Sequence, residues 1–166
     1  MKTLVLGIGN TLKGDDGIGV YVAERINEHL EKVKQDSQQA ESAGGAEDIA
    51  AIDCGTVVEN YTSAIREHEP DLLILVDAAD MGLSPGAYRS IPPEKIDVMC
   101  LSTHNIPLSL FVSYVGEFCQ RVILLGIQPA GMDFGTALSA DVQESGDFVA
   151  ALIVEKRLDE VKVLEV

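Results

Sequence analysis

The chain has 166 residues, of which 46% are hydrophobic, and this length and composition predict one folded domain spanning residues 1–166. Its 27 acidic and 12 basic residues give a formal net charge of −15, which repels a polyphosphate backbone, so no nucleic-acid partner is expected. No apolar stretch approaches the roughly 18 residues that a membrane span needs, so no membrane partner is expected either.

The cysteines and the amino terminus indicate a compartment. Cys54, Cys100 and Cys119 are odd in number and lack CxxC spacing, which is typical of free thiols in a reducing environment. The chain enters a strand at Thr3 without the charged region and cleavage site of a signal peptide. We therefore expect a cytoplasmic protein.

Hydrophobic periodicity predicts strands that alternate with amphipathic helices. In chain order, the predicted elements are a strand at 3–8, a helix at 18–34, a surface loop at 36–48, a strand at 49–52, a helix near 60–67, strands at 72–76 and 86–91, a helix starting at 105–107, a strand at 122–127 and a helix at about 141–158. This alternation is typical of βαβ units. It predicts an α/β fold with a mostly parallel sheet and helices on both faces.

The first predicted strand leads into a glycine-rich turn that carries two adjacent acids. Gly7 and Gly9 are followed by the run Gly14-Asp15-Asp16-Gly17. In a parallel α/β sheet this turn lies at the carboxyl end of a strand, where ligands bind. A phosphate is the usual ligand of such a turn, but two carboxylates repel a phosphate and attract a cation. The turn therefore predicts a cation site.

Familiar catalytic and nucleotide-binding motifs are missing from the chain. Gly7-x-Gly9 lacks the third glycine of G-x-G-x-x-G, and Lys13-Gly14 reverses the order of a P-loop. Neither G-x-S-x-G nor H-E-x-x-H occurs, so serine-hydrolase and common zinc-peptidase chemistry have no anchor in the sequence.

Three ionisable residues follow predicted strands or precede a predicted helix. Asp16 lies in the first turn, Asp77 ends the 72–76 strand, and His104 precedes the helix that starts at 105–107. Strand-end loops of a doubly wound sheet converge on one crevice, so these three side chains can meet. Two carboxylates and one imidazole suit a divalent transition metal and leave coordination positions open. We assign no role to His29 or His68.

Each of these residues also has an ordinary structural explanation. Asp15 or Asp16 could cap a helix and complement its dipole. Asp77 could accept hydrogen bonds from loop amides, and His104 could be a turn or capping residue. Only the joint placement of the three favours a site, and periodicity alone does not bring them together.

Four stretches, in this order and spacing, resemble the maturation endopeptidases of NiFe hydrogenases, above all the branch that processes the large subunit of hydrogenase 3 (formate hydrogenlyase type). The stretches are VLGIGN (5–10) with GDDGIG (14–19), LILVDAADMGL (73–83) with PG (85–86), STHNIPL (102–108) and LGIQP (125–129). Residues 36–48 resemble an insertion relative to that branch, and the sequence from Gly131 onward matches it loosely.

The resemblance implies a three-layer α/β/α sandwich around a twisted, mostly parallel five-stranded sheet. It implies that Asp16, Asp77 and His104 bind metal, and that Asp53 lines the same cleft without being a ligand. It further implies that Asp16 and Asp77 are the catalytic pair, in an aspartic or metal-assisted peptide hydrolysis.

The implied activity is endoproteolytic removal of the C-terminal extension from a nickel-loaded hydrogenase large-subunit precursor. Nickel would be supplied by the substrate and would serve as a recognition element, and we expect none tightly bound to the free protein. Two mechanisms stay open: the metal polarises the scissile carbonyl or its bound water, or a carboxylate acts as general base while the metal only marks the substrate.

Two other functions are compatible with parts of the sequence. A non-catalytic maturation chaperone could bind nickel or the precursor with the same three residues. A nucleotide-binding or peptidyl-tRNA-processing domain could use the short glycine turn, although the charge of −15 and the Asp15-Asp16 pair argue against it.

Overall fold

A computed structural model describes residues 1–37, 48–101 and 106–165 of the chain. Its sheet has five strands in the order β2-β1-β3-β5-β4. The strands are β1 (Thr3–Gly7), β2 (Ile49–Asp53), β3 (Leu72–Ala78), β4 (Tyr88–Ser90) and β5 (Arg121–Ile127). Only β4, at one edge, runs antiparallel to its neighbour, so the sheet is mostly parallel as predicted.

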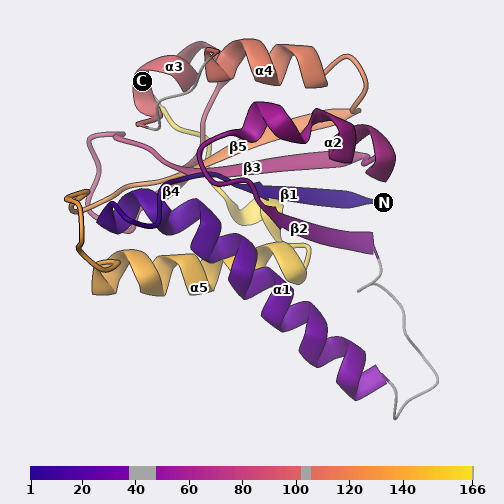
Figure 1. Cartoon of the computed structure of the whole chain (residues 1–166), viewed down its shortest axis with the longest axis horizontal. Helices are drawn as coiled ribbons and strands as arrows, with labels where there is room; N and C mark the ends of the chain where they lie inside the picture. The colour runs from indigo at the N-terminus through magenta and orange to yellow at the C-terminus, as the bar shows by residue number, and fades with distance from the viewer. Residues whose placement is uncertain (38–47, 102–105, 166) are drawn as a thin grey trace.

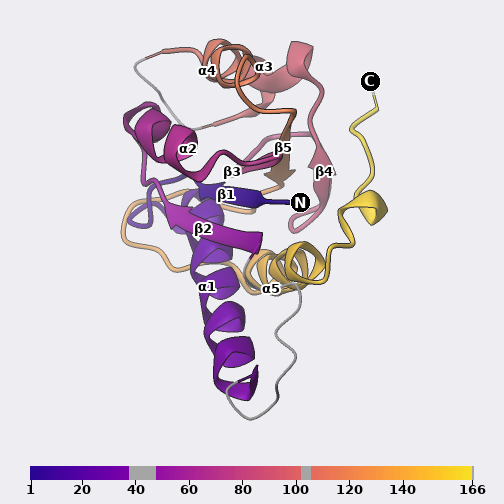
Figure 2. The ribbon, with the colours of Figure 1, turned by 90° about the vertical axis from the view of Figure 1, so that its right-hand side faces the viewer.

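Helices cover both faces of this sheet. Figures 1 and 2 show α1 (Ile18–Ser37) and α5 (Ala140–Val154) on one side, and α2 (Thr62–His68), α3 (Ile96–Met99) and α4 (Leu108–Val115) on the other. The three-layer α/β/α sandwich implied by the resemblance is therefore confirmed.

Two hydrophobic cores explain why the strand sequences are almost continuously apolar. Along β1, Leu4 and Leu6 enter the core under α2, α3 and α4, whereas Val5 enters the core under α1 and α5. Leu75 and Val76 of β3 divide in the same way. A strand that is covered on both faces needs apolar residues at both alternating positions, which gives a run rather than a polar–apolar alternation.

The glycines of the first turn permit close backbone packing. A Cβ on Gly19 would lie 2.1 Å from the carbonyl oxygen of Val76, so only glycine lets the first turn of α1 approach β3 this closely. Gly9 has a positive φ of 148°, and a Cβ there would lie 1.9 Å from the carbonyl oxygen of Asp16. The glycine pattern is thus accounted for by packing, without a bound phosphate.

Several element boundaries differ from the predictions. Helix α1 continues to Ser37, and residues 38–47 of the predicted 36–48 loop lie outside the described residues. Helix α5 ends at Val154, earlier than predicted, and Lys156 just beyond it has a positive φ of 59° that breaks helical geometry. After a 3-10 turn at Leu158–Glu160, the chain pairs with Ser90 and covers the outer edge of β4.

None of the helices in the described part of the chain combines the length and apolar character that membrane crossing requires.

Candidate active site at the carboxyl edge of the sheet

The carboxyl ends of the four parallel strands lie at one edge of the sheet, the left-hand edge in Figure 1. Gly7, at the end of β1, pairs with Asp53 of β2 on one side and with Val76 of β3 on the other. Asp77 follows directly and pairs with Gly126 of β5. The turn after β1, Asp53 and Asp77 are therefore neighbours across the sheet, as the strand-end positions predict.

Asp77 is fully buried near the end of β3. One of its carboxylate oxygens accepts a hydrogen bond of 2.8 Å from the backbone N–H of Ala78. The donor belongs to the last residue of β3 itself, so the ordinary explanation through loop amides stays a prediction.

Asp16 lies in a short 3-10 helix, η1 (Gly14–Gly17), that precedes α1 and packs against β3. Its side chain is buried, and Oδ2 accepts a hydrogen bond of 3.0 Å from the backbone N–H of Asn10. Asp16 and Asp77 are thus buried carboxylates on two elements in contact. The structure therefore places Asp16 and Asp77 on neighbouring elements, and their joint role as ligands stays a prediction.

The neighbouring Asp15 has a structural role. Its carboxylate accepts bonds of 2.8 and 3.0 Å from the N–H groups of Ala130 and Gly131, and bonds of 2.7 and 2.8 Å from the N–H and hydroxyl of Ser139. Burial alone would raise the pKa of Asp15, but these donors outweigh it and lower the pKa below its ordinary value. Asp15 therefore fastens the turn after β1 to the loop between β5 and α5.

Gln128, the first residue after β5, is a buried polar residue for which the sequence analysis predicts no role. Its Oε1 accepts a bond of 2.7 Å from the N–H of Met81 and one of 3.3 Å from that of Leu83, and its Nε2 donates to Asp80 Oδ1 at 3.2 Å. These bonds fix the segment that leaves β3 immediately after Asp77. A polar residue between a buried strand and Pro129 was the available sequence signal.

The pKa values of two thiols at this edge, Cys54 and Cys100, are raised by burial and by nearby acids. Burial, with the added charge of Asp53, raises the pKa of Cys54 to about 12. Burial also raises the pKa of Cys100, and the carboxylates of Asp77 and Asp97 raise it further. Both thiols are therefore held in their neutral form, mainly by burial and further by the nearby carboxylates.

The third predicted ligand, His104, lies outside the described residues. Leu101, three positions earlier, is placed at this edge, where its N–H lies 3.4 Å from the carbonyl oxygen of Ala78. Within residues 1–37, 48–101 and 106–165, no three His, Cys, Asp or Glu side chains gather as a metal site. Asp53 is exposed and accepts a bond of 2.9 Å from the N–H of Gly55, so its predicted place beside the cleft stays a prediction.

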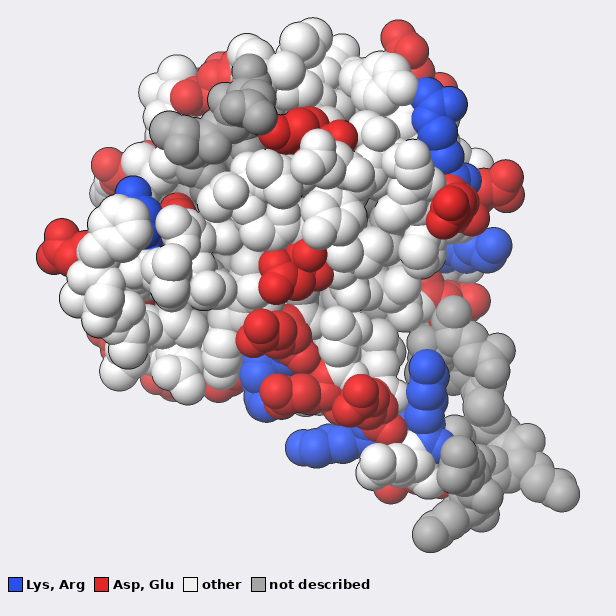
Figure 3. Space-filling view, viewed as in Figure 1, with Lys and Arg blue, Asp and Glu red and all other residues white. Residues whose placement is uncertain are grey.

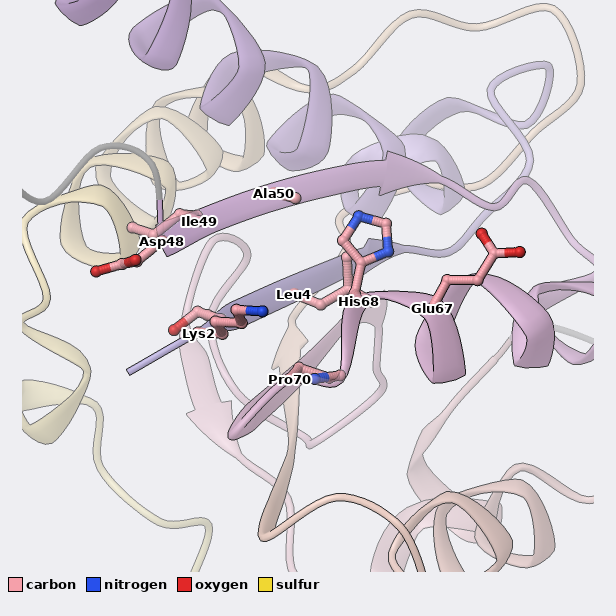
Figure 4. Close-up of a pocket in the computed structure, with 9 residues that line it drawn as sticks. Lys2, Leu4, Asp48, Ile49, Ala50, Glu67, His68 and Pro70 are labelled. Atoms are coloured by element: carbon pink, nitrogen blue, oxygen red, sulfur yellow. The ribbon is translucent and has the colours of Figure 1, made fainter.

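The opposite edge of the sheet carries a pocket of a different kind. This pocket has a volume of about 300 Å³ and is lined by residues that include Lys2, Asp48, Glu67 and His68 (Figure 4). His68 ends α2, and its Nδ1 lies 2.8 Å from the carbonyl oxygen of Ala64. Lys2, Glu67 and His68 are exposed, and Asp48 is partly buried.

Known proteins resemble the chain over nearly its whole length. Residues 20–156 match the hydrogenase maturation protease family. The hydrogenase 3 maturation protease of Escherichia coli K12 is 34% identical over 150 residues, which cover 90% of this chain and 86% of that protein.

Solved structures of hydrogenase maturation proteases have the same fold as this chain. The solution structure of the endopeptidase HycI from E. coli has a TM-score of 0.78 at 31% identity and covers 99% of this chain and 97% of its own. A maturation protease HycI from Thermococcus kodakarensis has a TM-score of 0.73 at 31% identity, covering 93% and 90%.

Proposed function

Because the chain belongs to the hydrogenase maturation protease family, within which it is similar to hydrogenase 3 members, we propose that it removes the C-terminal extension of a nickel-loaded NiFe-hydrogenase large-subunit precursor. The nickel is part of the substrate in this proposal. It marks a precursor that is ready for cleavage, and the protein partner is that precursor.

The observation that carries this proposal is the burial of Asp16 and Asp77 at the carboxyl edge, on elements that touch. Within the described residues, every buried side chain with a formal charge is an aspartate, and Asp15 joins two loops through backbone and hydroxyl donors. Two further buried carboxylates favour a cation, and carboxylate oxygens with an imidazole are suitable ligands for a divalent transition metal. We assign the imidazole to His104.

The same groups supply peptide hydrolysis with what it requires. Water must lose a proton as its oxygen bonds to the scissile carbonyl carbon, and the leaving nitrogen must gain one as the C–N bond breaks. A carboxylate such as Asp16 or Asp77 can accept and return that proton. Nickel held by the precursor would supply positive charge to the same site, where this proposal uses it to mark the substrate.

Nickel recognition follows from the sign of the site. A precursor without metal brings no positive charge to two buried carboxylates, whereas a loaded precursor compensates them. Cleavage then depends on the nickel ion, which only a loaded precursor carries. The protein discriminates between the two forms because binding of the nickel-free form is disfavoured.

Intact mass spectrometry of the precursor tests the proposal. The purified protein is incubated with nickel-loaded and with nickel-free precursor in parallel. We expect loss of a C-terminal fragment from the loaded form alone. Binding without cleavage of either form would instead support the maturation chaperone, and equal cleavage of both forms would exclude nickel recognition.

A further inference from the structure

Exposed apolar side chains surround the acidic edge of the sheet. Three strand-end loops each present one large apolar side chain to solvent: Leu12 after β1, Val57 after β2 and Phe134 after β5. A fourth exposed side chain, Leu101, follows α3 and lies beside the end of β3. We call these four residues the strand-end ring. Large apolar groups gathered around one functional edge are typical of a surface that another protein covers.

The two most prominent members of the ring are held in place. Leu12 and Phe134 are 67% and 72% exposed. Their loops are joined directly by a 2.9 Å hydrogen bond from the N–H of Gly135 to the carbonyl oxygen of Leu12, and the Asp15 network joins them a second time. Because the supporting backbone is already ordered, a partner loses little conformational entropy when it packs on these side chains.

The charge of this region also differs from that of the molecule. Lys13 is the only Lys or Arg in the two loops, residues 8–13 and 128–139, and Asp133 is the only acid there. The Nζ of Lys13 lies 5.6 Å from the centre of the Phe134 ring. Figure 3 shows acidic side chains in a band over α1, whereas the surface toward the left-hand end is largely uncharged, with a few acidic side chains along its outline. In a chain of net charge −15, the one base and one acid of these two loops repel an apolar surface with an acidic group less than the band over α1 does.

We propose that the strand-end ring is the docking surface for the folded body of the hydrogenase large-subunit precursor, which packs an apolar surface on Leu12 and Phe134 and presents an acidic group to Lys13. This inference rests on the proposed function, because that function names the partner. According to this inference, the protease binds the folded part of the precursor beside the cleavage site as well as the extension that it removes.

The test measures binding of nickel-loaded precursor by biolayer interferometry, and cleavage in parallel. The double variant Leu12→Ala/Phe134→Ala should raise Kd about 10-fold or more, because apolar and aromatic anchors dominate protein interfaces. The matched control is Leu110→Ala/Phe148→Ala, which removes the same side-chain types at 57% and 48% exposure on α4 and α5. The control should bind as the wild type does, and circular dichroism should show that both variants are folded.

Lys13→Glu tests the charge, and we expect weaker binding than for Lys13→Ala, with the difference shrinking at high salt. A wild-type Kd in Leu12→Ala/Phe134→Ala, or tighter binding by Lys13→Glu, would overturn the docking surface. Wild-type protein that binds the precursor through the ring but never cleaves it would refute the proposed function alone. Failure of the wild type to bind would refute both.

Discussion

The two edges of the sheet both carry ionisable side chains, but these side chains differ in burial and in sign of charge. At the amino edge, Lys2, Asp48, Glu67 and His68 line an open pocket, carry both signs of charge and remain in contact with water. At the carboxyl edge, Asp15, Asp16 and Asp77 carry one sign of charge and are buried.

Burial of a charge is costly unless something compensates it, so the buried edge, rather than the open pocket, indicates function. The three acids at the carboxyl edge also differ from one another in their hydrogen-bond partners. Asp15 is engaged by four donors that lie in or at the end of a single loop, which explains its presence by structure alone. Asp16 and Asp77 are the two buried acids to which the proposed function gives a chemical role.

The largest expected effect comes from Asp77→Asn. This change keeps the shape of the side chain and removes its charge, so cleavage of nickel-loaded precursor should fall by about 10²–10⁴-fold. The rate is measured by intact mass at saturating precursor. Asp48→Asn, at the amino edge, is the matched control and should cleave at the wild-type rate. Cleavage by Asp77→Asn at a similar rate would remove the distinction between the edges.

A change in backbone packing should have the largest effect on stability. Gly19→Ala places a methyl group 2.1 Å from the carbonyl oxygen of Val76, and should lower the free energy of unfolding by about 3 kcal/mol or more. The measurement is urea denaturation. Gly131→Ala is the control, because its Cβ meets no atom within 4 Å. Equal stability of the two variants would contradict the close approach of α1 to the sheet.

Asp15→Ala should also destabilise the fold, by about 2–3 kcal/mol, because donors of Ala130, Gly131 and Ser139 lose a charged acceptor. The pH dependence gives a sharper test. The pKa of Asp15 lies below its ordinary value of 3.8 in the folded protein, so its stabilisation is fully present above that value.

This contribution should disappear as the pH falls from about 4 through the lowered folded pKa. The stability advantage of the wild type over Asp15→Asn, measured by chemical denaturation between pH 3 and 7, should therefore shrink only below about pH 4. An advantage that is constant across this range would show that the Asp15 carboxylate is not selectively stabilised in its charged form.

The smallest effect is expected for Asp53→Asn. Asp53 is exposed, and an asparagine oxygen can still accept the bond from Gly55, so cleavage should fall less than about 10-fold. Removal of this charge should lower the pKa of Cys54, measured by alkylation rate against pH. A loss of activity as large as that of Asp77→Asn would make Asp53 part of the metal or catalytic set.

The sequence predicted the fold well where long patterns were available. Continuous apolar runs predicted β1, β3 and β5, and their burial on both faces confirms the reason. Helix α3 was not predicted, because its four residues, Ile96–Met99, are too few to show a helical period. The end of α1 was placed too early because polar residues near Ser37 read as a loop.

The site was predicted only in part. Asp77 was identified because an acid that ends a buried strand is conspicuous, and its burial supports that choice. Asp15 and Asp16 could not be told apart from local sequence, since the partners that separate them lie up to 124 residues away. The role of Gln128 was hidden for the same reason, because its bond to Met81 spans 47 residues.

The comparison of edges is tested most directly by a pair of histidine variants. His104→Ala and His68→Ala are each incubated with nickel-loaded precursor, and the products are read by intact mass. We predict that His104→Ala loses cleavage while His68→Ala, at the amino edge, cleaves at the wild-type rate. Normal cleavage by His104→Ala would contradict the assignment of Asp16, Asp77 and His104 as one nickel-recognising site.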